Sequence, residues 1–280
     1  MKIISGPASQ LLATRVAKEL DCDILLAEYK RFPDGEACVR VLDEIGDDVL
    51  IIQSTVSDGD LIYLLQLVDA CEEVERVRVV IPYFRYARQE RTSHPGEPIS
   101  ARAIARTIDA DEIFTVNIHD PSVLGHFNGP AHDLDVAPLI GDYIRSLDLD
   151  RPIIIAPDDG ACALARSSAS KLGIDYDVLE KIRLNGEDVE IKPKHIDIMN
   201  RDVVIVDDII STGETMVEAI ELLWRQKPND IYVACVHPVL ARNALIRLFK
   251  AGIKELIATD TIENGASIVS AAPVIAKAVE

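Results

Sequence analysis

Short runs rich in valine and isoleucine alternate along this chain with longer segments in which apolar residues recur at helical spacing. Such alternation is typical of βαβ units, in which each crossover helix packs on a mostly parallel sheet. The expected strands are 2–5, 49–53, 77–82, 113–118, 152–156, 203–206, 231–236 and 255–259. The expected helices are 9–20, 61–71, 101–109, 161–172, 215–225 and 242–250. The pattern therefore predicts an α/β fold with helices flanking mostly parallel sheets.

The two halves of the chain resemble each other at an offset of roughly 150 residues. Ile-Ile-Ser-Gly-Pro at 3–7 is echoed by Ile-Ile-Ala-Pro-Asp at 154–158, and the segment 49–59 is echoed by 203–213. We interpret this as two similar α/β domains, 1–140 and 141–280, with the last dozen residues folding back onto the first. The alternative is chance similarity between any two βαβ repeats.

The chain has 280 residues and carries 47 acidic against 29 basic side chains, a formal net charge of −18. This balance excludes a generic nucleic-acid binder, which needs a basic surplus to cancel phosphate charge. Of the acidic residues 28 are Asp, and of the basic residues only 11 are Lys. We therefore hypothesise that the protein comes from an organism that lives at high salt, where Asp-rich surfaces stay hydrated and the repulsion between their charges is screened. The alternative is an ordinary acidic cytosolic protein.

The expected compartment follows from what the sequence lacks. Its first residues are too briefly apolar for a signal peptide, and no stretch approaches the ~18 uninterrupted apolar residues of a membrane span. The five cysteines are scattered and form no C-x-x-C pair, which favours a reducing compartment over a disulfide framework or zinc site. We expect a cytoplasmic protein with neither a membrane nor a nucleic-acid partner.

The strongest local signal is 203–215, where four β-branched apolar residues lead into Asp207-Asp208 and then into a Ser-Thr-Gly-Glu-Thr turn. A buried strand delivers both carboxylates to the carboxyl edge of the sheet, where open α/β folds bind ligands. The turn presents backbone N–H groups and hydroxyls at a helix N-terminus, which suits a phosphate. Because carboxylates accept from sugar hydroxyls, the segment favours a phosphorylated pentose. The alternative is a threonine-capped helix after an acidic turn. The expected binding residues are Asp207, Asp208, Ser211, Thr212, Gly213, Glu214 and Thr215.

This segment resembles the 5-phosphoribosyl 1-diphosphate loop shared by phosphoribosyltransferases and ribose-phosphate pyrophosphokinases. Arg-Phe-Pro-Asp-Gly-Glu at 31–36 and Pro-Tyr-Phe-Arg-Tyr-Ala-Arg-Gln-Glu-Arg at 82–91 resemble nucleotide-binding signatures of the pyrophosphokinases only. The similarity runs from about residue 3 to the end and is to archaeal-like members, with a composition that suits a halophile. It implies two similar phosphoribosyltransferase-like domains with mostly parallel sheets.

The two nucleotide signatures imply an ATP site. Phe32 supplies an aromatic surface for a purine, and carboxylates beside it accept from the base or ribose. Arginines after residue 82 can clamp triphosphate oxygens, although a solvated basic face is the alternative. The residues 92–98 are expected to form a mobile loop. By resemblance, the neighbouring subunit completes the site, which implies a homo-oligomer, a dimer or higher. The expected ATP-binding residues are Phe32, Asp34, Gly35, Glu36, Arg88, Gln89 and Arg91.

Resemblance to the family also implies a metal. His119 and Asp158, each at a predicted strand end, fall on the positions of the family's metal-binding residues. Magnesium suits a site with few protein ligands that is completed by substrate phosphates. From the residues alone, a histidine at a strand end is more often a satisfied structural residue than a ligand.

Lys181 and Arg183 alternate along an extended segment, and Asn-Gly at 185–186 follows as a turn signal. Both charges therefore face the same way on one arm of a hairpin-like flap. In the family a Lys and an Arg here close over the transferring phosphates, which makes them the expected catalytic residues, with Arg183 also reaching the ribose 5-phosphate. The alternative is an exposed strand with a solvated charged face.

The resemblance implies the reaction ATP + D-ribose 5-phosphate → AMP + 5-phospho-α-D-ribose 1-diphosphate, a step that feeds nucleotide biosynthesis. A phosphoribosyltransferase and a catalytically inactive regulatory homologue are the alternatives. The sequence departs from the family pattern at Ser211, where many members have Asp, and at Glu214, where they have Gly. Glu214 places a negative charge beside the expected phosphate site. The segment 120–127 also differs from the usual continuation after the metal histidine.

Overall fold

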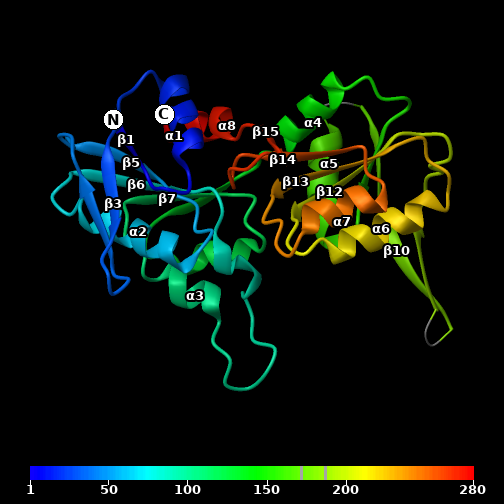
Figure 1. Ribbon diagram of the computed structural model, residues 1–280, viewed down its shortest axis with the longest axis horizontal. Helices are drawn as coiled ribbons and strands as arrows, with labels where there is room; N and C mark the ends of the chain where they lie inside the picture. Colours follow the sequence, from blue (N-terminus) through cyan, green and yellow to red (C-terminus); the bar gives the residue numbers. More distant parts are fainter. Residues whose placement is uncertain (171–172, 186–187) are drawn as a thin grey trace. The chain divides into compact units, whose positions relative to one another are not determined.

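The computed structural model describes residues 1–170, 173–185 and 188–280, and the chain divides into two compact units. Unit 1 comprises Met1–Asp135, Thr261–Glu263 and Ser270–Glu280, and unit 2 comprises Val136–Asp260 and Asn264–Val269. The chain therefore returns to unit 1 after it has completed most of unit 2. Figure 1 shows each unit as a sheet with helices on both faces.

Unit 1 is built on a six-stranded sheet in which every neighbouring pair of strands is parallel. All its strands therefore end at the same edge, the edge where open α/β folds bind ligands. The strands are, in spatial order, β2 (Ile24–Leu25), β1 (Lys2–Ser5), β5 (Asp48–Ile52), β6 (Arg76–Ile81), β7 (Glu112–Val116) and β8 (Ala131–Leu134).

Helices cover both faces of the unit 1 sheet. In Figure 1, α1 (Gln10–Leu20) and α8 (Ala272–Val279) lie on one face, and α2 (Asp58–Asp69) and α3 (Ser100–Ala105) on the other. Successive strand residues point to opposite faces, and residues 49–52 of β5 are all fully buried. Near-continuous Val/Ile runs are what such a doubly covered parallel strand requires. The remaining elements are the hairpin β3 (Ala27–Arg31) and β4 (Ala37–Val41) and the turns η1 (Arg85–Arg88) and η2 (Pro121–His126).

Unit 2 is built on a seven-stranded sheet that is parallel except for one antiparallel pair, β10 with β11. Its strands are, in spatial order, β11 (Asp188–Pro193), β10 (Asp175–Asn185), β9 (Ile153–Ala156), β12 (Val203–Ile209), β13 (Ile231–His237), β14 (Glu255–Thr259) and β15 (Ser267–Val269). Its helices are α4 (Ala137–Ser146), α5 (Cys162–Ser170), α6 (Glu214–Trp224) and α7 (Ala244–Ala251), with the short turn η3 (Asp159–Ala161). In Figure 1 the pair α4 and α5 faces the sheet from the side opposite α6 and α7.

The two sheets share a strand order. The succession β1, β5, β6, β7 and β8 in unit 1 matches β9, β12, β13, β14 and β15 in unit 2. The internal repeat in the sequence therefore corresponds to a repeated topology, and the predicted α/β class with two similar domains is confirmed.

Several element boundaries differ from the predicted ones. Helix α2 starts at Asp58 because Ser57 and Asp60 form a reciprocal capping box at its N-terminus, which adds a turn before the apolar run that the periodicity detects. Strand β12 continues past 206 to Ile209, so it includes both aspartates. The predicted strands and helices omit β2, β3, β4, β8, β15, α4 and α8. Strand β8, for example, reads Ala-His-Asp-Leu and carries two exposed polar residues, too weak a pattern for a strand prediction.

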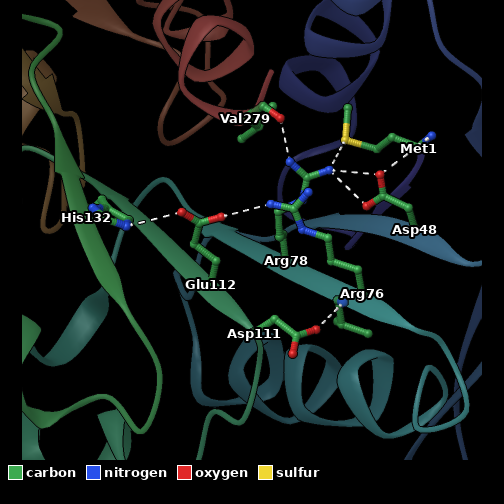
Figure 2. Close-up of polar contacts among 9 residues, drawn as sticks. Met1, Asp48, Arg76, Arg78, Asp111, Glu112, His132 and Val279 are labelled. Carbon is green, nitrogen blue, oxygen red and sulfur yellow. Dashed lines mark hydrogen bonds and ion pairs between the residues drawn. The ribbon is translucent and has the colours of Figure 1, made fainter.

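A buried arginine ties the C-terminal helix to the unit 1 sheet. The Arg78 side chain, only 4% exposed, donates from Nη2 to both carboxylate oxygens of Asp48 at 2.9 and 3.1 Å. It also donates to the carbonyl of Val279 in the last turn of α8 and lies 2.8 Å from the Met1 sulfur. Figure 2 shows Arg78 between these three partners, all at the edge opposite the strand carboxyl ends.

We expect Asp48→Ala to lower the free energy of unfolding by about 2–3 kcal/mol, because it leaves the buried guanidinium of Arg78 without its counter-charge. Urea titration followed by circular dichroism measures this loss. The matched control is Arg76→Ala, which removes a half-exposed guanidinium paired with Glu112 at 3.5 Å and should cost less than about 1 kcal/mol. Equal losses in the two variants would contradict the assigned role of the buried pair.

Candidate functional site

Two adjacent carboxylates mark the carboxyl end of β12. Residues 203–206 are fully buried, and the next two, Asp207 and Asp208, are partly buried. Asp207 Oδ1 accepts from the N–H of Asp208 at 2.9 Å, and Asp208 Oδ1 accepts from the N–H of Ile209 at 2.7 Å. Burial raises the pKa of Asp207 to about 7, with further contributions from the charges of Asp208 and Asp158. The site thus concentrates negative charge, and Asp207 holds a proton over part of the physiological range.

Asp158 lies on the same edge, because β9 is the parallel neighbour of β12. Its Oδ1 accepts from the N–H groups of Gly160 at 2.9 Å and Ala161 at 3.4 Å, which caps η3 and fixes the carboxylate. Carboxylates gathered at one edge suit a hard divalent cation such as magnesium. The described residues contain no cluster of three or more His, Cys, Asp or Glu side chains arranged to hold a metal by themselves.

The loop after β12 leads directly into α6. Gly213 is the N-cap residue, adopts φ +75°, and has no side chain with which to bind the first N–H groups of the helix. A Cβ at this position would lie 3.4 Å from Cβ of Ala244 in α7 and in a conformation that L side chains disfavour. The helix N-terminus thus offers backbone N–H groups to an anion. The hydroxyl residues Ser211, Thr212 and Thr215 lie on the same turn.

The predicted flap is an antiparallel hairpin of β10 and β11, in which Lys181 pairs with Ile191 and Arg183 with Val189. The side chains of Lys181 and Arg183 lie outside the described residues. At the base of the hairpin, the Asp177 carboxylate is 4% exposed and accepts from the N–H groups of His195 at 2.8 Å and Ile196 at 3.0 Å. Sequence reasoning missed Asp177, since nothing in the local pattern distinguishes it from a surface aspartate.

In unit 1, the segment 31–36 forms the turn of the β3–β4 hairpin. The N–H of Phe32 donates to the carbonyl of Glu36 at 2.9 Å, the N–H of Gly35 to the carbonyl of Phe32 at 2.8 Å, and the N–H of Glu36 to Asp34 Oδ1 at 3.2 Å. Gly35 adopts φ +96°, as the tight turn requires. The Phe32 ring is half exposed, and Asp34 and Glu36 are exposed. The turn thus presents an aromatic surface and two carboxylates to solvent.

The predicted phosphate clamp begins at η1. Arg88 is the last residue of η1 and is exposed, and Gln89 follows it as the C-cap. Gln89 Oε1 accepts from the Ser100 hydroxyl at 2.5 Å, and its carbonyl accepts from the N–H of Ala101 at 3.2 Å. These bonds join the segment to the start of α3. Arg91 is exposed and forms an ion pair with Glu90 at 3.3 Å. Ser100 is a supporting residue that sequence reasoning did not identify.

His119 follows β7 in unit 1 and is exposed. Its turn is held by Asp133, which accepts from the Thr115 hydroxyl at 2.6 Å and from the N–H of Ile118 at 2.9 Å. Although Asp133 is exposed as a residue, partial desolvation of its carboxyl group raises the pKa, and the two donated hydrogen bonds partly offset this effect. Of the predicted metal residues, His119 thus belongs to unit 1 and Asp158 to unit 2.

A mostly parallel sheet with an acidic pair, followed by a glycine-capped helix N-terminus, defines the phosphoribosyltransferase class in unit 2. Accordingly, residues 127–268 match the model of the phosphoribosyl transferase domain. Residues 1–111 match the model described as the N-terminal domain of ribose phosphate pyrophosphokinase. The chain belongs to the ribose-phosphate pyrophosphokinase family.

Individual relatives are similar to this chain over nearly its whole length. The chain is 53% identical to the ribose-phosphate pyrophosphokinase of Methanosarcina acetivorans, over 100% of this chain and 99% of the relative. It is 41% identical to that of Halobacterium salinarum strain R1, over 99% of each chain. A crystal structure of phosphoribosylpyrophosphate synthetase from Mycobacterium smegmatis aligns with a TM-score of 0.85 at 28% identity, covering 99% of this chain and 97% of the other. Within the described part of the chain, no helix has the length and apolar character needed to cross a membrane.

Proposed function

We propose that the protein transfers the diphosphoryl group of ATP to the C1 hydroxyl of D-ribose 5-phosphate. The C1 hydroxyl oxygen attacks the β-phosphorus in line and its proton is released to solvent. The bond from that phosphorus to the α,β-bridging oxygen breaks, so AMP is the leaving group and 5-phospho-α-D-ribose 1-diphosphate is the second product. The observation that carries this proposal is the pairing of Asp207 and Asp208 with the glycine-capped N-terminus of α6, in a chain whose residues 1–111 match the N-terminal domain of ribose phosphate pyrophosphokinase. In this pairing hydroxyl acceptors stand next to a phosphate-binding turn.

Each set of residues has a proposed role. The turn 211–215 holds the 5-phosphate, and Asp207 and Asp208 hold the ring hydroxyls. Phe32, with Asp34 and Glu36 in the turn around Gly35, takes the adenosine, and Arg88, Gln89 and Arg91 take the triphosphate. Lys181 and Arg183 stabilise the charge on the transferring phosphates, and such stabilisation dominates catalysis of phosphoryl transfer.

Magnesium is the proposed metal, held by His119 and Asp158. When bound, it neutralises triphosphate charge and orients the reacting phosphates. Three carboxylates, of Asp158, Asp207 and Asp208, lie at the carboxyl edge of the unit 2 sheet, and the charges of Asp158 and Asp208 contribute to the raised pKa of Asp207. This concentration of negative charge supports a cation at that edge. The Oδ1 bonds that fix Asp158 to η3 hold its carboxylate in one orientation.

The proposed setting is a homo-oligomer in the cytoplasm, a dimer or higher, with the active site near a subunit interface. The exposed turn of the β3–β4 hairpin supports this proposal, because its Phe32 leaves half of its aromatic surface uncovered by its own chain. The acidic net charge of −18 argues against nucleic acid as a partner.

One assay tests the reaction. The purified protein is incubated with ATP, ribose 5-phosphate and magnesium, and the products are separated by anion-exchange chromatography. We expect AMP and the diphosphorylated sugar in equal amounts. Formation of ADP instead would indicate single-phosphoryl transfer. In a parallel incubation with 5-phosphoribosyl 1-diphosphate and a base, formation of a nucleotide would favour a phosphoribosyltransferase. The absence of product in both incubations would favour an inactive homologue.

Salt is expected to raise or spare this activity. The 28 Asp and 11 Lys residues give the surface a repulsion that salt screens, and the negative field does not steer anionic substrates. The measurement is kcat/KM for ribose 5-phosphate from 0.2 to 3 M KCl. A steep fall with added KCl would contradict both this prediction and the hypothesis of a halophilic owner.

A further inference from the structure

Glu214 is the one charged residue between 209 and 215, and its carboxylate has a defined partner. Glu214 is exposed at the first position of α6, and its Oε1 lies 3.2 Å from Nη1 of Arg247 in α7. The Glu214 side chain is 68% exposed and the Arg247 side chain 44%. The carboxylate is therefore directed along the surface toward the neighbouring helix.

The placement of Arg247 follows from the packing of α7. Helices α6 and α7 lie side by side on one face of the unit 2 sheet (Figure 1). Ala244, in the first turn of α7, contacts the Gly213 backbone position, and both Ala244 and Leu248 are fully buried. Arg247 stands three residues after Ala244, so it lies on the same side of the helix one turn further along. The close approach at Gly213 thus brings the Arg247 guanidinium to the start of α6.

We propose that Arg247 is a positioning residue for sugar-phosphate binding, which holds the Glu214 carboxylate away from the phosphate turn and neutralises its charge. This inference rests on the proposed function, in which the turn 211–215 takes the 5-phosphate. Without Arg247, the carboxylate at the first position of α6 repels a phosphate dianion bound by the same helix N-terminus. It also competes for the positive end of the helix dipole.

The expected effect is modest and depends on salt. Both side chains are largely in solvent, where ion pairs contribute little and charge repulsion is screened. We expect a change of several fold at low ionic strength that shrinks toward none in molar KCl. Loss of a purely structural contact would persist at high salt, so the salt dependence distinguishes the two roles.

The test uses steady-state kinetics on the full chain, at the lowest KCl concentration at which the wild type keeps its full circular dichroism signal and again at 2 M KCl. At low salt, Arg247→Ala should raise the KM for ribose 5-phosphate about 3- to 10-fold, with kcat and the KM for ATP changed by less than about twofold. Arg247→Lys should stay close to wild type, because it keeps the charge. The matched control is Lys250→Ala, which removes a charge from the same helix three residues further along and should leave all three constants unchanged.

The decisive variant is the double substitution Arg247→Ala with Glu214→Gln. It should return the KM for ribose 5-phosphate to the wild-type value or below, because the repelling charge is gone. The inference would be overturned if Arg247→Ala had the wild-type KM for ribose 5-phosphate at low salt. It would also be overturned if the double variant had a KM as high as that of the single variant. Wild-type protein that forms no AMP from ATP and ribose 5-phosphate would instead overturn the proposed function. In that case, calorimetric titration of the wild type and the variants with ribose 5-phosphate measures their affinities for the sugar phosphate without turnover.

Discussion

Replacing Lys181 by alanine should lower kcat at least about 100-fold, with a much smaller change in the KM for either substrate. Lys181 stands in β10 opposite Ile191, on the hairpin whose base is held by Asp177. In the proposed reaction its ammonium group meets the transferring phosphates mainly in the transition state. Loss of an interaction made only there lowers kcat and leaves substrate binding nearly intact. Initial rates over a matrix of ATP and ribose 5-phosphate concentrations measure both constants.

Lys192→Ala is the matched control for this prediction. Lys192 stands opposite Glu180 in the same hairpin, one register position away from the Lys181 pair, so the substitution removes an equal charge from the flap. We expect its kcat to stay within about threefold of wild type. Near-normal turnover in Lys181→Ala, or equal losses in the two variants, would show that the flap lysine has no specific part in transfer.

Replacing Asp207 by asparagine should lower kcat/KM for ribose 5-phosphate about 100-fold, and at pH 8 it should make the protein more stable. The loss follows from removing a charged acceptor of sugar hydroxyls. The gain follows from the pKa of Asp207, which burial and the charges of Asp208 and Asp158 raise to about 7. At pH 8 the wild type must keep an ionised carboxylate buried beside other carboxylates, whereas the amide carries no charge.

The pH dependence of this gain has a definite sign. An unfolded aspartate has a pKa of about 3.9, so between about pH 4 and pH 7 the folded state binds the proton more tightly than the unfolded state. Protonation therefore stabilises the fold at low pH, and this stabilisation is lost as the pH rises through about 7. The stability advantage of Asp207→Asn should be largest above pH 7 and vanish near pH 4. Thermal melts in EDTA, from pH 4.5 to 8.5, measure it without bound metal.

Asp202→Asn is the control for the stability gain. Asp202 directly precedes β12, is 6% exposed, and accepts from the N–H of Asp150 at 2.7 Å. Because this carboxylate is satisfied and lies at the other end of the strand, its replacement should lower stability and spare activity. If Asp207→Asn melts below wild type at pH 8, the buried-charge explanation is wrong.

The fold was largely predictable from local patterns. Runs such as 49–52 and 203–206 are apolar on both faces because helices cover both sides of a parallel sheet, and this requirement produces a continuous apolar pattern that the sequence shows directly. The acidic pair and the turn that leads into α6 were predictable because Asp207 through Thr215 are contiguous, so one segment carries the whole signal. The short strand β8 was missed because two of its side chains are exposed and polar, which leaves no periodic apolar pattern.

The supports of the candidate site were not predictable, because each depends on residues distant in the sequence. Asp133 fixes the turn before His119 through Thr115 and Ile118, and Asp177 fixes the flap base through His195 and Ile196. The sequence around an isolated aspartate does not distinguish a solvated carboxylate from a buried one. Only the packing decides which of its oxygens lose water and gain N–H donors.

The sequence by itself determined the α/β class, the internal repeat, the family and the position of the acidic turn before α6, because each is encoded in contiguous residues or in a local period. The tertiary structure decided what holds these parts in place. It decided what holds the C-terminal helix α8 in unit 1, where Arg78 reaches Val279 across 201 residues of chain. It also turned Glu214, a departure from the family pattern, toward Arg247 in the next helix. Polar contacts of this kind join residues that no local pattern links, so only the folded chain reveals them.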